Sequence, residues 1–166
     1  MHPLRDKSCC CLTGYRMELI RISAQSPESV YDFYARESLE RKREGDRVTP
    51  DMLDFMRVCL EHIRTAIDLP PVFVVTSHYR LRLIAGDSYE LPTLVMLEPT
   101  VDGIKVSYLL TDSEAPWHNA RVSGLATTPS VAAEMVRVSL ARNANARSTD
   151  ISRNNGMDTK GSVSRF

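Results

Sequence analysis

The stretch VFVVTSHYRLRLIAGDSYELPTLVMLEPTVDGIKVSYLLT, residues 72–111, decides the fold class because it has the pattern of consecutive short β-strands. Apolar and polar residues alternate through 79–85 and 104–110, and a period of two places neighbouring side chains on opposite faces of a strand. Residues 72–75 and 94–97 are continuous apolar runs, which are typical of strands buried on both faces. The stretch predicts three or four antiparallel strands.

Turn residues separate these strands. Gly86-Asp87-Ser88 allows the chain to reverse, and Asp102-Gly103 is a strong hairpin signal before the last strand. Ser77-His78 is a weak turn. The sequence therefore leaves open whether 72–85 forms one long bent strand or two strands.

Helices are predicted on both sides of the sheet segment. Ser26-Pro27 and Thr49-Pro50 are start signals, and the second opens an amphipathic helix over about 50–67. A third start signal precedes a helix over 129–142. Its apolar residues form two sides, so we expect a helix laid across a sheet; the sides are Val131, Met135, Val138 and Ala132, Val136, Leu140.

An alternating segment at 15–23 adds a strand before the first helix, and we expect it to join the later sheet. The order is then β-α-α-β-β-β-β-α. This order predicts an α+β domain over 15–142, with an antiparallel sheet of about four or five strands packed by three helices. We expect 1–14 to be a flexible arm and 143–166, which has almost no apolar content, to be a disordered polar tail.

The composition and charge of the chain limit the classes of protein to which it can belong. The chain has 166 residues, 43% hydrophobic and 25% charged, with 21 basic and 21 acidic side chains. This balance is ordinary for a soluble globular protein and argues against a dedicated DNA-binding protein. No apolar run is long enough to span a membrane or to form a signal peptide.

Three of the four cysteines are adjacent, Cys9–Cys11, and the fourth, Cys59, falls in a predicted helix. This spacing does not suit a disulfide framework, so we expect a reducing, cytoplasmic compartment. Acylation of Cys9, Cys10 and Cys11 would tether the chain to a membrane. The alternatives are soft-metal binding with His2 and a leader without a role. We expect no metal and no cofactor.

Two groups of residues are candidate sites. His78, Arg80 and Arg82 share one strand face, which Lys105 could join, and such a basic face suits a phosphate, RNA or an acidic partner. The alternative is a solvated outer face, and acidic residues outnumber basic ones in 70–127, which makes nucleic acid the lesser expectation.

The second group lies in the long segment 112–127, part of which could be a short strand at 120–125. It holds Glu114 and the only tryptophan, Trp117, beside His118. Trp117, flanked by Arg121, is suited to be an interface anchor, or else a buried residue that stabilises the end of the sheet.

Two family resemblances bear on an enzymatic alternative. Gly86-Asp87-Ser88 resembles the nucleophile block of the GDSL hydrolases, but the chain lacks their Asp-x-x-His motif, so we interpret it as a turn. The element order and Tyr79-Arg80-Leu81-Arg82 resemble the RelE/ParE-type ribonuclease toxins. The strongly basic surface of those ribonucleases is missing here.

The sequence favours a non-enzymatic protein-interaction module of the immunity, antitoxin, adaptor or effector type, whose partner is another protein. The first alternative is a small hydrolase or RelE/ParE-like ribonuclease that uses His78, Arg80, Arg82 and His118. The second is a protein tethered to a membrane through Cys9–Cys11.

Overall fold

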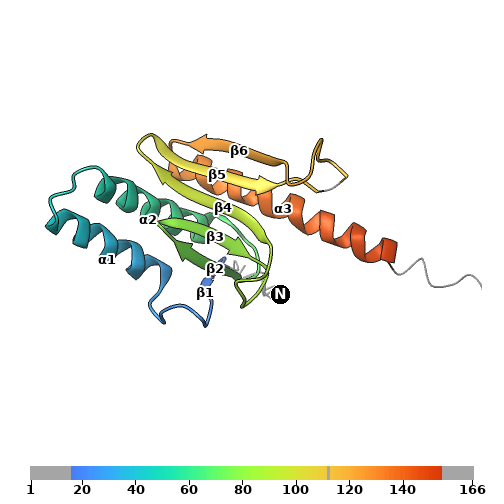
Figure 1. The fold of residues 1–166 in the computed structure, drawn as a ribbon, viewed down its shortest axis with the longest axis horizontal. Coiled ribbons are helices and arrows are strands. Elements are labelled where there is room, and N and C mark those ends of the chain that lie inside the picture. Colours follow the sequence, from blue (N-terminus) through green and yellow to red (C-terminus); the bar gives the residue numbers. More distant parts are fainter. Residues whose placement is uncertain (1–15, 112, 155–166) are drawn as a thin grey trace, which may run out of the picture.

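A computed structural model of the chain describes residues 16–111 and 113–154, with side chains up to Asn143. Six strands form one sheet in the order β1-β2-β3-β4-β5-β6, and three helices accompany it (Figure 1). The elements are β1 (Leu19–Arg21), α1 (Val30–Arg43), α2 (Thr49–Ala66), β2 (Val72–Ser77), β3 (Arg80–Ile84), β4 (Thr93–Thr100), β5 (Gly103–Leu109), β6 (Arg121–Ala126) and α3 (Pro129–Asn154). The α+β class is confirmed.

The sheet is mixed, so the prediction of a purely antiparallel sheet is wrong. β1 pairs with β2 in parallel, with Leu19 opposite Val72, whereas every later pair is antiparallel. The cause is the connection: α1 and α2 carry the chain back to the end of the sheet where β1 began. A crossover of this kind joins parallel strands, while tight hairpins join antiparallel ones.

Residues 72–85 form two strands, which answers the question that the sequence left open. The turn between β2 and β3 consists of His78 and Tyr79, whose φ angles are 47° and 65°. Positive φ at both loop residues is the geometry of a type I′ turn, in which glycine and asparagine are preferred. The Tyr34 hydroxyl of α1 donates to the carbonyl of Tyr79 at 2.8 Å, and Arg41 donates to the Tyr79 hydroxyl at 2.6 Å. Helix α1 therefore fixes a turn that the residue types disfavour.

One element is displaced by a residue from its prediction, and another is longer. The possible short strand at 120–125 is β6, which has the same length, begins one residue later and pairs with β5 along its whole length. Helix α3 continues past the predicted end at residue 142 to Asn154. No glycine or proline interrupts this extension, although it contains only two alanines and two arginines among mostly asparagine, serine and other residues of lower helix propensity. The arm at 1–14 and the end of the tail at 155–166 lie outside the described residues.

All three helices cover the same face of the sheet, and the main core lies between the two layers (Figure 1). α1 lies next to β1, α2 packs against β4 and β5, and α3 packs against β4, β5 and β6. Side chains of α2 and of the central strands are fully enclosed; among the largest are Leu53, Met56, Leu60, Leu81, Leu83 and Leu97. A smaller cluster on the other face buries Ile22, Val75 and Ile84.

Candidate interaction surface

The basic residues on the outer face of the sheet lie together as predicted, but acidic and polar neighbours engage them. Arg80 donates to Glu98 of the adjacent strand at 2.8 Å. Lys105 is paired in register with the same Glu98 from the other side. The outer face therefore carries a row of alternating charge, which weakens it as a binding site for a phosphate backbone.

Arg82 is also engaged. Its Nε donates to the Thr93 hydroxyl at 2.7 Å, and a terminal nitrogen lies 3.4 Å from the carbonyl of Leu91. These contacts join β3 to the connection that leads into β4. Arg82 thus has a structural role at this place.

The structure does not bring the two candidate histidines together. His78 is not in a strand: it lies in the β2–β3 turn, where its ring contacts the hydroxyl of Ser77 at 3.2 Å. The pairing registers place that turn at the end of the sheet where β4 passes into β5. His118 lies in the β5–β6 loop at the opposite end, roughly 15–20 Å away along the strands. A single catalytic site does not contain both residues in this arrangement.

The β5–β6 loop holds Trp117 at the surface, with 70% of the residue exposed. The neighbouring backbone is anchored, because the N–H of Ala120 donates to the carbonyl of Trp117 at 3.2 Å. Asn119 has a φ of 62°, a value that asparagine adopts more readily than most residues. The exposure of Trp117 contradicts its interpretation as a buried residue that stabilises the end of the sheet, whereas the interface anchor stays a prediction. His118 is exposed beside it.

Strand β6, next after this loop, forms a free edge of the sheet. The N–H of Leu110 donates to the carbonyl of Ala120 at 2.9 Å, which sets the alternation of the ladder between β5 and β6. By that alternation the backbone N–H and C=O groups of Arg121, Ser123 and Leu125 point away from β5. Within the described part of the chain, no strand pairs with this side of β6.

An apolar groove of about 260 Å³ runs beside this strand, between β6 and α3. It is lined by Val106, Tyr108, Val122, Ser123, Gly124, Glu134, Met135, Val138 and Ser139. Gly124 has a specific packing role here, since a Cβ atom on it would lie 2.6 Å from Cε of Met135. Met135 therefore covers the strand where that strand has no side chain.

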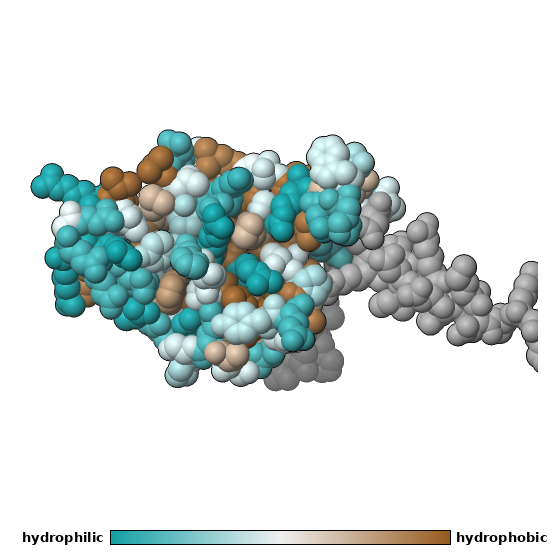
Figure 2. Space-filling model, in the orientation of Figure 1, coloured by the Kyte–Doolittle hydropathy of each residue, from teal (hydrophilic) through white to brown (hydrophobic). Residues whose placement is uncertain are grey.

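Half of the large apolar side chains that the described chain exposes belong to β6, to the loop before it or to α3; they are Trp117, Val122, Leu125, Val131 and Val138. Of the two in β6, Val122 lies on the helix face of the sheet and Leu125 on the outer face. We call this surface the β6–α3 edge and define it by those residues, the rest of β6 and Met135. Figure 2 shows hydrophobic surface along the upper border of the molecule, towards β6 and the β4–β5 turn, whereas the end formed by α1 is mostly hydrophilic. Clustered apolar exposure of this kind marks an interaction site more often than scattered apolar residues do.

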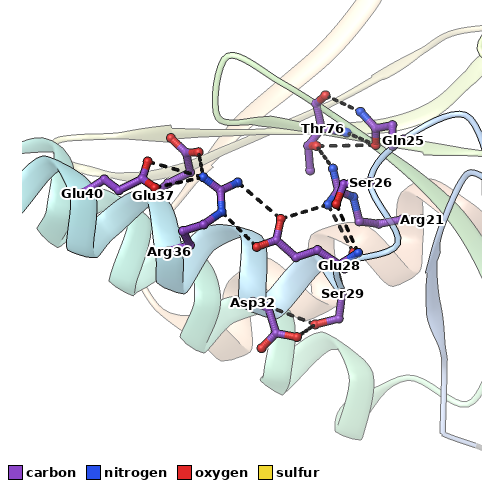
Figure 3. A network of polar contacts seen from close by, with 10 residues as sticks. All are labelled: Arg21, Gln25, Ser26, Glu28, Ser29, Asp32, Arg36, Glu37, Glu40 and Thr76. Carbon is purple, nitrogen blue, oxygen red and sulfur yellow. Dashed lines mark hydrogen bonds and ion pairs between the residues drawn. The ribbon is translucent and has the colours of Figure 1, made fainter.

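The opposite edge of the sheet carries a polar network that the sequence did not indicate (Figure 3). Arg21 of β1 points towards the helices with 8% of its side chain exposed. It donates to Thr76 at 3.0 Å and to the carbonyl of Glu28 at 3.2 Å, and it lies over the ring of Phe33. Glu28 also accepts from Arg36 at 3.0 Å. The only sequence signal was an arginine at an apolar position of a short alternating strand.

Other candidate chemistry finds little support. Cys59 is buried, and burial raises the pKa of its thiol to about 11, so the nucleophilic thiolate is disfavoured. His62 contacts Ser130 at 3.4 Å. Among residues 16–111 and 113–154, no cluster of three or more His, Cys, Asp or Glu side chains is placed to hold a metal. In the same residues, no helix combines the length and apolarity needed to cross a bilayer. Cys9–Cys11 lie outside the described residues.

Comparison of the chain with models of known protein families, with curated proteins and with solved structures found no match.

Proposed function

We propose that this protein is a protein-interaction module that binds its partner through the β6–α3 edge and has no catalytic activity of its own. One observation supports this most strongly: the outer side of β6, with which no strand of the described chain pairs, lies beside an apolar groove and exposed apolar side chains. A free strand edge supplies main-chain hydrogen bonds, and adjacent pockets supply selectivity for side chains.

The edge lacks the devices that prevent unwanted pairing. Natural edge strands are commonly short, contain proline or lysine, or carry a bulge. β6 has six residues, and its only charged one is Arg121. Its pairing with β5 runs without a register shift. Such an edge fits a surface that is covered when the protein functions.

Trp117 supports the same assignment. Tryptophan and arginine are enriched among the residues that contribute most to interfaces. Trp117 and Arg121 lie at the start of this edge, one in the loop and one in the strand. The ribonuclease alternative gains no comparable support, because His78 and His118 lie at opposite ends of the sheet.

The test is affinity capture from native lysate with the isotope-labelled full chain as bait, followed by mass spectrometry, so that a captured native copy of the same chain is distinguished from the bait. Leu125→Lys and Trp117→Ser change the edge, and Val58→Lys changes an equally exposed side chain on α2. We expect a protein captured by the wild type and by Val58→Lys, and depleted at least tenfold with the edge variants. Equal capture by all four baits, or recovery of RNA in place of protein, would contradict the proposal.

A further inference from the structure

We infer that the occupant of the β6–α3 edge is a second copy of this chain, paired antiparallel through β6 across a two-fold axis at Ser123. The inference rests on the proposed function, since it names the partner of the same surface. Its basis is the self-complementarity of the edge in hydrogen bonding, in side-chain size and in charge.

The hydrogen-bonding groups of β6 match a two-fold axis at Ser123. Arg121, Ser123 and Leu125 carry the outward groups, and they are evenly spaced about Ser123. An axis there, perpendicular to the sheet, pairs Ser123 with its own copy and Arg121 with Leu125 of the second copy. Every outward N–H and C=O group of the strand then has a partner in a regular antiparallel ladder. The same operation keeps the helices of both copies on one face.

The side chains on the helix-facing side fit the same register. Val122 of one copy comes to lie opposite Gly124 of the other, as a pair without direct hydrogen bonds, in which side chains approach most closely. Gly124 has no side chain, and Met135 lies above it. A large residue thus faces a small one, and Val122 of the second copy contacts Met135 and the apolar groove.

The charges do not oppose this arrangement. The register places Arg121 opposite Leu125 of the second copy, so the two Arg121 side chains are separated by about four residues, roughly 13 Å. On α3, Arg137 donates to Glu134 of its own chain at 2.6 Å, which neutralises the charges nearest the groove. Like charges directly opposite one another would destabilise a strand pair, and none is brought together.

The edge consists of a strand and a helix. The six residues of β6 span about 20 Å, and α3, whose 26 residues span about 39 Å, packs against this strand. The edge is therefore two layers deep. Met135 and Val138 of α3 line the same groove as Ser123. The two-fold axis at Ser123 therefore places them near Met135 and Val138 of the second copy. The Trp117 loop then lies beside the connection from β6 to α3 of the second copy.

The first experiment measures the mass of the purified full chain in solution by sedimentation equilibrium over a range of concentrations. We expect the mass of two chains, shifting to one chain on dilution. Ser123→Pro removes the central outward N–H without removing a bond to β5, and proline is tolerated on edge strands, so this variant stays folded and monomeric. Val138→Lys should weaken the dimer at least tenfold, whereas Val58→Lys, on α2, should not.

A second experiment tests the register by disulfide trapping. In a chain with Cys9–Cys11 changed to Ser, which retains only buried Cys59, Ser123→Cys brings two thiols to the axis. Facing residues of a hydrogen-bonded pair have Cα atoms about 5.5 Å apart, within the range of a disulfide. Arg121→Cys is the matched control, because its copies are too far apart. We expect a cross-linked dimer with Ser123→Cys and not with Arg121→Cys.

The outcomes separate this inference from the proposed function. A single-chain mass up to about 1 mM, where an interaction of about −4 kcal/mol is half formed, overturns the dimer. So does a dimer that is indifferent to Ser123→Pro and gives no cross-link with the Ser123→Cys variant. If the edge variants then still lose a different captured protein, the proposed function stands and only the identity of the partner is wrong. If the edge variants capture the same proteins as the wild type, both the dimer and the proposed function are wrong.

Discussion

At its β1 edge the sheet ends in a strand of three residues tied to α1 by a nearly buried arginine. At its β6 edge a six-residue strand lies beside apolar side chains, and no strand of the described residues pairs with its outer side. An inward-pointing charge and a short strand are both devices that prevent edge-to-edge pairing. The β1 edge has both, and the β6 edge has neither. The contrast shows that the two ends of one sheet can differ, so that one end carries devices against pairing and the other does not.

Arg21 provides the largest expected effect at the closed edge. Arg21→Ala removes the bonds to Thr76 and to the Glu28 carbonyl in a nearly solvent-excluded place, and we expect a loss of about 2–3 kcal/mol in the free energy of unfolding. Urea denaturation measures it. Arg36→Ala is the control, because Arg36 holds the same Glu28 while 45% exposed, and should cost less than about 1 kcal/mol. Equal losses of stability in the two variants would show that the burial of Arg21 does not determine its contribution.

The next largest expected effect is a difference in the free energy of unfolding between variants of two tyrosines of α1, Tyr34 and Tyr31. Tyr34→Phe removes the hydroxyl that donates to the β2–β3 turn, and we expect a loss of about 1–1.5 kcal/mol. Tyr31→Phe removes a buried hydroxyl that has no partner among the described residues. Its unfolding free energy should stay unchanged or rise by up to about 1 kcal/mol. A larger loss for Tyr31→Phe than for Tyr34→Phe in thermal or urea unfolding would contradict these contacts.

At the open edge, Gly124→Ala should have a smaller effect on the single chain. The new Cβ displaces the end of a flexible methionine, so we expect a loss of about 1 kcal/mol or less. A double-mutant cycle with Met135→Ala should show coupling between the two positions. If Val122 of a second copy occupies the same place, Gly124→Ala also weakens the dimer, and sedimentation on the same samples detects this.

The smallest expected effect is a loss of folding stability that is absent near neutral pH and appears in alkali. Burial raises the pKa of Tyr31 to about 12 from its usual 10.0, with Glu61 adding to the rise, and burial also raises the pKa of Tyr34. Below pH 10.0 both hydroxyls are protonated in the folded and unfolded chains, and their contribution is constant. Above it the unfolded chain loses protons first, so stability falls as pH rises from 10.0 towards 12. The Tyr31→Phe/Tyr34→Phe double variant should lose stability less steeply; an unchanged slope would contradict the assignment.

Local signals predicted part of the local structure. The start signal at Ser26-Pro27 was wrong by three residues, because the N-cap of α1 is Ser29, whose hydroxyl accepts from the N–H of Asp32. Other local signals were right. Asp102-Gly103 marks the β4–β5 hairpin, where Gly103 has a φ of 143° and a Cβ atom would clash with the carbonyl of Ala126. The amphipathic pattern of 50–67 likewise predicts α2 to within a residue at each end. In these cases the residue types themselves specify the backbone.

Long-range relationships could not be predicted in the same way. Nothing within the segment 15–23 specifies which strand it pairs with or in which direction, so the parallel β1–β2 pair was missed. The two apolar sides of α3 were visible in sequence, but not that Val131 and Val138 face an open edge while Val136 faces the core. Tertiary position decides such differences.

The strand order has a consequence for how the chain folds. β2 to β6 are joined in sequence by connections of at most eleven residues, so their contacts close much smaller loops than those of β1 and can form early. The β1 contacts must bridge far more chain, since Arg21 and Thr76 are 55 positions apart. We expect β1 to dock after the rate-limiting step, so that changes at Arg21 accelerate unfolding and leave the refolding rate almost unchanged. β1, which comes first in sequence among the six described strands, would then be the last of them to join the sheet.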